Sequence, residues 1–129
     1  MLRRATHDDV SQLAQMNWQL IRDEGSDNPM TIEQLAERMT GLLATTYHAW
    51  IIQPEQQAIG YILVDIGRTP VYLRQMYIAA SYRRCGYGRA AFVALCDELT
   101  HVPLEVESFA WNSPAVAFWQ SVGFTPCVI

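Results

Sequence analysis

The hydrophobic residues change from helical to strand-like spacing near residue 48, and this change limits the fold more than any other feature. Before it, two stretches that begin at Thr6 and Thr31 carry apolar residues at helical spacing. After it, three short runs rich in β-branched and aromatic residues alternate with turn residues, which is typical of antiparallel strands. We therefore expect two helices followed by a meander of three strands over 48–53, 58–66 and 71–79.

The next part of the chain predicts one parallel crossover. A glycine-rich loop over 83–89 follows the third strand of the meander and opens a helix, which Pro103 ends. A further strand is predicted over 104–111. Strand–helix–strand passages within one sheet are parallel and right-handed. One parallel pair of strands is therefore expected in an otherwise antiparallel sheet.

The two ends of the chain complete the predicted fold. Residues 2–5 suit an edge strand, and 124–129 suit a short final strand. Between them, Ser113 caps a last helix that Gly123 ends. The fold class is α/β (α+β), with a mixed, mostly antiparallel central sheet flanked by helices. The length predicts a single domain over 1–129.

The composition is that of a folded, acidic chain. Half of the 129 residues are hydrophobic and 17% are charged, which excludes a disordered chain. Nine Lys and Arg against 13 Asp and Glu leave a net charge of −4, so nucleic acid is not an expected partner. No apolar run approaches the ~18 residues of a membrane span, and the N-terminus lacks the apolar segment of a signal peptide. We expect no membrane association.

The three cysteines, Cys85, Cys96 and Cys127, are widely spaced and form no CxxC pair. An odd number of unpaired cysteines argues against a disulfide framework and against a zinc site. The three histidines are scattered as well. We therefore expect no metal site, and reduced thiols in a cytoplasmic location.

The loop Arg83-x-x-Gly86-x-Gly88 is the sharpest chemical motif. Its glycines allow a tight turn and a close approach of the backbone to a ligand. The first amides of the following helix, together with the helix dipole, form an anion site suited to phosphate. Arg84 and Arg89 add positive charge. A glycine turn flanked by solvated arginines is the other interpretation of the loop alone.

A second motif runs from Asn112 to Phe124 and carries paired aromatic residues, Phe118 and Trp119. Alone, this segment is equally typical of an amphipathic helix that packs on the core. Both motifs sit on the predicted elements in the order strand, loop, helix, strand, helix. Their combination is more specific than either motif by itself.

Together the motifs resemble those of the GNAT superfamily of N-acetyltransferases. The family's Arg/Gln-x-x-Gly-x-Gly/Ala loop matches Arg83 to Gly88, and its apolar–aromatic–apolar strand matches Met76-Tyr77-Ile78. Its Asn-x-x-Ala-x-x-Phe-Tyr-x-x-x-Gly-Phe helix matches Asn112 to Phe124, with Trp119 in place of the tyrosine. The resemblance implies a GNAT-like fold, in which the parallel strands of the βαβ unit splay apart.

The resemblance also implies acetyl-CoA as the cofactor and an amine of a small molecule or peptide as the acceptor. Pantetheine would bind main-chain groups in the splay, and pyrophosphate would bind the loop amides. The acidic segment 23–29 would border the acceptor groove, although a solvated turn explains it too. The implied cofactor-binding residues are Met76, Tyr77, Ile78, Arg83, Arg84, Cys85, Gly86, Tyr87, Gly88, Arg89, Asn112, Phe118 and Trp119.

The chemistry requires that the amine lose a proton before it attacks the thioester. Glu107, on the strand over 104–111, is the candidate base, and Gln75 is a candidate for positioning a water. A cross-strand ion pair between Glu107 and Arg74 is the competing interpretation. The N–H of Ile78 is the candidate oxyanion donor.

Two departures from the family pattern keep a second hypothesis open. Trp119 replaces the tyrosine that often serves as general acid, and the strand over 71–79 carries no carboxylate. The alternative is therefore a noncatalytic CoA-binding module with the same fold. The short tail after Phe124 predicts an exposed strand edge, and with it a homodimer.

Overall fold

The computed structural model describes residues 1–106 and 113–123. Five strands form one sheet in the order β1-β2-β3-β4-β5. The first four are antiparallel to their neighbours, and β4 and β5 are parallel. The strands are β1 (Leu2–Arg4), β2 (Tyr47–Ile52), β3 (Gly60–Asp65), β4 (Val71–Ile78) and β5 (Leu104–Val106).

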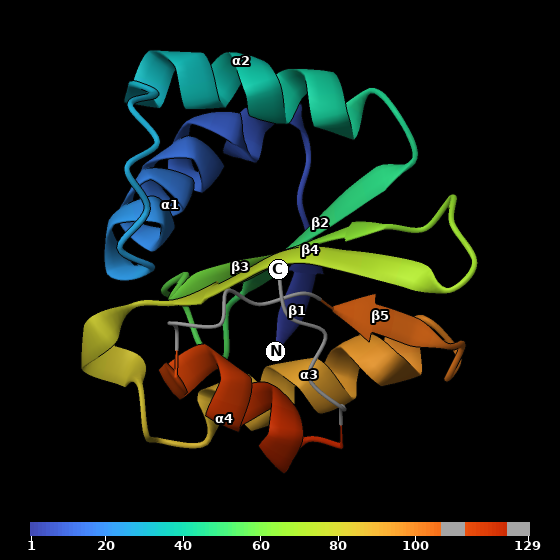
Figure 1. The fold of residues 1–129 in the computed structure, drawn as a ribbon. Coiled ribbons are helices and arrows are strands. Elements are labelled where there is room, and N and C mark those ends of the chain that lie inside the picture. The colour runs from blue at the N-terminus through green and yellow to red at the C-terminus, as the bar shows by residue number, and fades with distance from the viewer. Residues whose placement is uncertain (107–112, 124–129) are drawn as a thin grey trace.

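Helices cover both faces of the sheet. In Figure 1, α1 and α2 lie above it, and α3 and α4 lie below it. Two short 3-10 helices, η1 and η2, precede α1 and α3. The helices are η1 (His7–Asp9), α1 (Val10–Asp23), α2 (Ile32–Leu43), η2 (Ala80–Tyr82), α3 (Tyr87–Glu98) and α4 (Ser113–Ser121).

The predicted fold class is confirmed: the sheet is mixed and mostly antiparallel, with helices on both sides. The parallel pair is the one that the βαβ segment predicted. The short 3-10 helices at 7–9 and 80–82 were not predicted. The predicted strand over 124–129 and the second part of the strand over 104–111 lie outside the described residues. That the chain is one domain stays a prediction.

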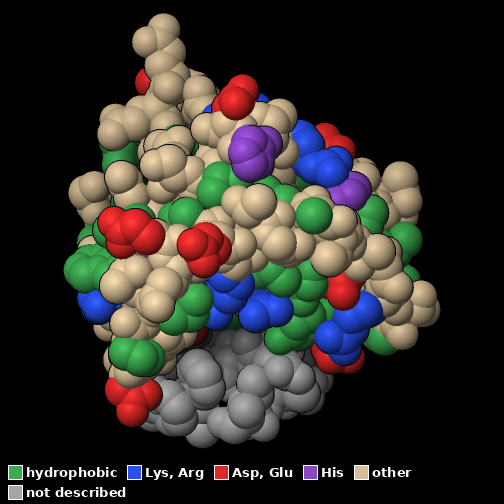
Figure 2. Space-filling model, turned by 90° about the horizontal axis from the view of Figure 1, so that it is seen from above, with side chains coloured by type: hydrophobic (Ala, Val, Ile, Leu, Met, Phe, Trp, Pro, Cys, Tyr) green, Lys and Arg blue, Asp and Glu red, His purple; other side chains and the backbone are tan. Residues whose placement is uncertain are grey.

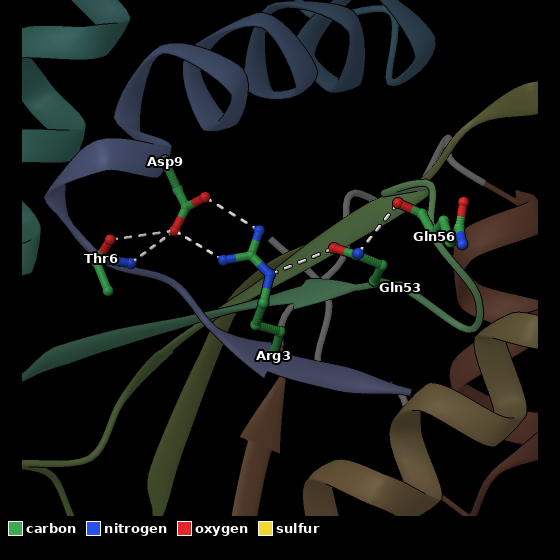
Figure 3. Close-up of polar contacts among 5 residues, drawn as sticks. All are labelled: Arg3, Thr6, Asp9, Gln53 and Gln56. Carbon is green, nitrogen blue, oxygen red and sulfur yellow. Dashed lines mark hydrogen bonds and ion pairs between the residues drawn. The ribbon is translucent and has the colours of Figure 1, made fainter.

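A polar cluster fixes the entry into the first helix. The Asp9 carboxylate accepts a hydrogen bond from the Thr6 backbone N–H at 2.8 Å and two from the Arg3 guanidinium at 3.0 and 3.1 Å (Figure 3). Arg3 also donates to Gln53, so the cluster ties β1 to the end of β2. Thr6 is therefore the N-cap residue of η1, and α1 follows one turn later.

The core has one layer on each face of the sheet because side chains alternate along β2 and β3. One set of side chains packs under α1 and α2, and the other packs against α3. Burial on both faces explains why β3 is almost continuously apolar. The α1/α2 layer includes Leu13, Met39, Ala49, Ile51, Tyr61 and Leu63, and the α3 layer includes Trp50, Ile52, Ile62, Val64, Phe92 and Leu95.

A bulge interrupts β4 at Arg74. Leu63 of β3 pairs with Gln75, but the next residue, Val64, pairs with Leu73, so Arg74 is the additional residue. The bulge lets two consecutive residues face the α1/α2 side. Gln75 reaches the buried Tyr61 hydroxyl there, and Arg74 reaches the hydroxyl of Tyr47.

Candidate active site

A cavity of about 780 Å³ opens along β4 and is bounded by the end of α1, the start of α3 and α4. It passes from the α1/α2 side of the sheet to the α3/α4 side. Its lining residues are Leu20, Asp23, Glu24, Leu73, Arg74, Gln75, Met76, Tyr77, Ile78, Arg83, Arg84, Gly86, Gly88, Arg89, Phe118, Trp119 and Ser121.

The edge of β4 that faces this cavity carries main-chain groups of Met76 and Ile78. The carbonyl of Tyr77 faces β3, where a Cβ on Gly60 would lie 1.9 Å from its oxygen. The N–H of Ala79 also points to β3 and donates to the carbonyl of Ile59 at 2.8 Å. Since main-chain groups alternate along a strand, those of Met76 and Ile78 point to the opposite edge.

The described pairing of β4 with β5 covers Val71–Leu73 and ends there. Met76 and Ile78 therefore follow the last described pair. The predicted splay needs the course of the chain after Val106, and that segment lies outside the described residues. The splay stays a prediction.

The glycine loop leads directly into α3. Gly86 is the N-cap residue and has a φ of +82°, in the left-handed region that glycine adopts at low cost. A Cβ at Gly86 would meet no atom within 4 Å, so the space in front of the loop is open. Because α3 starts at Tyr87, its first amides lack partners within the helix. Open space beside free amides suits a phosphate group.

The two sequence motifs meet at the start of α3. A Cβ on Gly88 would lie 3.2 Å from the Phe118 ring, so the missing side chain lets α4 approach closely. Arg89 donates to the carbonyl of Ser121 at 3.3 Å. Trp119 is half-buried and lies edge-on to Phe92, with ring centroids 6.0 Å apart. These contacts position α4 against the loop.

Arg83 links the two ends of the cavity. Its Nε donates to the carbonyl of Ile78 at 2.7 Å, and its Nη2 lies 2.5 Å from the Asp23 carboxylate. The first contact holds the loop against the edge of β4 that faces away from β3. The second reaches the last residue of α1, on the other side of the sheet.

Most of the predicted site residues line the cavity, and Gln75 is among them. Cys85 and Tyr87 do not. Cys85 is exposed, with its Sγ 3.3 Å from the carbonyl of Arg83, and Tyr87 packs edge-on against Tyr82. Glu107 and Asn112 lie outside the described residues.

Glu24 is the carboxylate that the sequence did not single out as a base. It is half-buried in the cavity wall, and this burial raises the pKa of its carboxyl, with the negative charge of Asp23 as a smaller cause. The sequence contains a feature that could have indicated this residue. Acidic residues at the C-terminal end of a helix are unfavourable, because they oppose the helix dipole. Asp23 ends α1 and Glu24 caps it.

The side chain of Gln75 is oriented by a hydrogen bond from the buried Tyr61. The Tyr61 hydroxyl donates to Gln75 Oε1 at 2.8 Å. Burial, followed by the negative charge of Glu24, raises the pKa of Tyr61 well above its usual value, so the phenol stays protonated. With Oε1 engaged by Tyr61, the amide N–H groups of Gln75 remain for the cavity.

Asn17 extends this polar network under α1. It is 1% exposed, and its Oδ1 accepts a hydrogen bond from Arg38 of α2 at 3.0 Å. Its Nδ2 has no hydrogen-bond partner among the described residues. The only polar residue in the apolar stripe of α1 therefore connects α2 to the region behind Gln75.

The described part of the chain contains neither a cluster of metal ligands nor a membrane-spanning helix. No group of three or more His, Cys, Asp or Glu side chains is placed to hold a metal ion there. Nor does any helix there combine the length and the apolar character needed to cross a membrane.

Comparison with known proteins gives one matching family. The model of the acetyltransferase (GNAT) family matches residues 9–124. The match therefore includes both motifs and every described residue of the cavity wall.

The proteins similar to this chain include a curated relative and several solved structures. Peptidyl-lysine N-acetyltransferase YiaC of Escherichia coli (strain K12) is 29% identical over 58% of this chain and 48% of its own length, so the match spans about half of that protein. A possible acetyltransferase from Clostridium difficile 630 superposes with a TM-score of 0.80 at 19% identity, over 100% of this chain and 92% of the other. A predicted acetyltransferase with acetyl-CoA from Clostridium acetobutylicum gives 0.72 at 18% identity, over 97% and 89%. The two structures share the fold.

Proposed function

The chain belongs to the acetyltransferase (GNAT) family, and we propose that it transfers the acetyl group of acetyl-CoA to a primary amine of a small molecule or a peptide. The observation that carries the proposal is the continuous cavity along β4. One end of it holds free helix amides and arginines, and the other end holds Glu24 beside Asp23, whose carboxylate pairs with Arg83. An anionic donor and a cationic acceptor thus find complementary charge at opposite ends of one space.

The residues at the loop end fit coenzyme A. The amides at the start of α3, with Arg84 and Arg89 in the cavity wall, suit the pyrophosphate. The main-chain groups of Met76 suit the amide groups of pantetheine, which would add to the sheet edge as an extended strand does. Arg83 already occupies the carbonyl of Ile78, so the N–H of Ile78 is the group left for the thioester oxygen of the ligand. Bound acetyl-CoA would supply a thioester as the acyl donor.

We propose Glu24 as the group that accepts the proton of the acceptor amine. A lysine-like amine has a pKa near ~10.4, so it must be deprotonated before it attacks. A carboxylate with a raised pKa is a stronger base than an exposed one. Gln75, held by Tyr61, would position a water between amine and carboxylate. Glu107 remains a second candidate.

Attack on the thioester and departure of the thiolate need fewer side chains than deprotonation of the amine. The N–H of Ile78 would stabilise the negative charge that develops on the thioester oxygen. A thiol has a pKa of ~8.5, so a thiolate leaves readily near neutral pH without a general acid. The Trp119 indole is a hydrogen-bond donor and no proton source, so its proposed role is to pack on the cofactor. The tyrosine missing from the family pattern is then not required.

We propose the chemical class of the acceptor and not a single compound. The relative from Escherichia coli acts on peptidyl-lysine by its name, which supports an aliphatic primary amine for this chain as well. A cytoplasmic location, with its supply of acetyl-CoA, stays a prediction from the unpaired cysteines.

The test combines acetyl-CoA with a panel of free amines, aminoglycosides and lysine peptides. Release of the CoA thiol and mass spectrometry of the products measure turnover. Because the chain contains no lysine, any acetyl-lysine that is detected comes from the acceptor. Amine-dependent thiol release is the expected result. Binding of CoA without turnover of any amine would instead favour the noncatalytic CoA-binding module, and absence of CoA binding would overturn both.

A further inference from the structure

Arg74 brings a positive charge into the acceptor half of the cavity. The bulge turns it toward the α1/α2 side, where it is exposed and lines the same wall as Glu24. Its Nη1 donates to the Tyr47 hydroxyl at 3.4 Å, and its guanidinium lies 5.6 Å from the centroid of that ring. Tyr47 therefore orients the Arg74 guanidinium through one of its five N–H donors.

Arg38 is a second cation on this side of the sheet. It is half-buried on α2 and bonds to Asn17. Burial lowers the pKa of Arg38, and the positive charge of Arg74 is the next cause. Of these two cations, only Arg74 lines the cavity. None of the ion pairs found among the described residues includes either of them.

None of the described ion pairs compensates the charge of Arg74 in the cavity wall, so an anionic ligand would be favourable beside it. The phosphates of coenzyme A are poorly placed for this, because Arg74 precedes Ile78 by four residues, about 13 Å of strand, and the loop lies beyond. Figure 2 shows arginine side chains in blue near the middle of the face seen from above, with acidic side chains in red on the same face.

We propose that Arg74 forms an anion subsite for the acceptor, so that good acceptors carry a carboxylate or a phosphate besides the reactive amine. The inference rests on the proposed function and narrows its substrate class. Guanidinium groups suit these anions because their paired N–H donors match two oxygens at once. The amine would lie toward Asp23 and Glu24, and the anion toward Arg74.

The test uses pairs of acceptors that differ in one charge. β-Alanine is compared with β-alaninamide, O-phosphoethanolamine with ethanolamine, and a lysine dipeptide with its C-terminal amide. The wild-type protein should favour the anionic member of at least one pair by ~10-fold or more in kcat/KM. The pair with the larger ratio distinguishes a carboxylate from a phosphate.

Variants assign the preference to the subsite. Arg74→Gln should raise KM for the anionic acceptor and leave the neutral one nearly unchanged, and Arg74→Glu should reverse the preference. Arg4→Gln removes the same charge from β1, at the other edge of the sheet, and should change neither ratio. Equal use of both members by the wild type would overturn the inference. So would an equal loss for both in Arg74→Gln, which is expected if Arg74 pairs with Glu107.

A binding measurement keeps the inference separate from catalysis. With coenzyme A saturating the loop, inorganic phosphate or acetate should raise the Tm of the wild type more than that of Arg74→Gln. If no amine is acetylated but this difference is present, the proposed function fails and the anion subsite stands. If amines are acetylated without any charge preference and the difference is absent, the proposed function stands and the subsite fails.

Discussion

The two sides of β4 differ in how their polar groups are assembled. On the α3/α4 side, the loop arginines, Gly86 and the first turn of α3 come from one short stretch of the chain. On the α1/α2 side, Glu24, Gln75 and the groups behind them come from four different elements. The first arrangement depends on local backbone geometry, and the second depends on packing between distant segments.

This difference has a functional counterpart in our proposal. The loop side would hold the part of the reaction that is common to acetyltransferases, which is the phosphate and pantetheine of the donor. The helix side would hold the amine and determine which acceptor is used. Arg83 joins the two sides through its contacts with Ile78 and Asp23.

The largest expected effect is on the loop side. Gly86→Val should weaken coenzyme A binding by ~100-fold or more, because a side chain at a φ of +82° is strained and would fill the open space in front of the α3 amides. Isothermal titration calorimetry with coenzyme A measures the loss. Circular dichroism checks that the variant is folded.

Gly25 offers a matched control for the strain. It has a φ of +69° and open space around its Cβ position, but it follows α1 on the other side of the sheet. Gly25→Val should lose a similar amount of stability and keep its affinity for coenzyme A. Equal loss of affinity in both variants would mean that strain, and not a phosphate site, explains the effect.

The next largest effect tests the helix side. Glu24→Gln should lower kcat/KM by ~10²-fold near neutral pH and leave the affinity for coenzyme A unchanged. Glu33→Gln, which removes a carboxylate from the first turn of α2, is the control and should stay active. If Glu24→Gln retains full activity and Glu107→Gln does not, the base is Glu107.

The pH dependence follows from the raised pKa of Glu24. The carboxylate accepts a proton only when ionised, so wild-type kcat/KM should rise as the pH passes its pKa, which lies above the ordinary pKa of a glutamate side chain. In the Glu24→Gln variant, kcat/KM should not show this rise. Its deficit should also shrink toward alkaline pH, where free amine is abundant. A pH–rate profile of both proteins measures this, and a deficit that is constant with pH would remove Glu24 from the proton transfer.

A smaller effect is expected at Trp119. Trp119→Ala should weaken coenzyme A binding by ~2- to 10-fold through lost aromatic packing. Trp119→Phe should leave the single-turnover rate nearly unchanged, because no general acid is needed. A large fall in that rate, with the affinity unchanged, would show that the indole takes part in the chemistry.

The smallest effect concerns a contact that belongs to neither side of the site. Asp9→Asn should cost about 1 kcal/mol of stability and no activity, because it weakens the cap at Thr6 and the contact with half-exposed Arg3. Arg3 lowers the pKa of Asp9. This stability is therefore present above the unfolded pKa near ~3.9 and is lost as the pH falls through the lower folded value. Urea unfolding at pH 7 and pH 3 measures both.

The sequence brought together residues of one short stretch that the structure also brings together. Met76, Ile78, Gly86 and Gly88 were predicted as cofactor residues, and all line the cavity, while their binding of the cofactor stays a prediction. Spacing alone could not separate them from Cys85, which lies in the same loop outside the cavity wall. Which loop residues face inward depends on backbone dihedral angles that the sequence does not state.

The sequence was a poor guide to the helix side. Glu24 was seen as one of several acids in a polar turn, although only Asp23 and Glu24 of that segment line the cavity. Gln75 was chosen without its partner, because Tyr61 lies 14 residues away on another strand. The bulge that lets Arg74 and Gln75 share a side has no signal in the hydrophobic pattern, since it shifts the register within one strand.

The order of the described helices and strands, their parallel pair and the loop that opens α3 could be predicted from the sequence, because they follow from periodicity, turn residues and local backbone preferences. That Glu24, Gln75 and Arg74 meet at one cavity became visible only in the folded chain. That meeting depends on how α1 crosses β4 and where β4 bulges, and both are set by packing over the whole sheet.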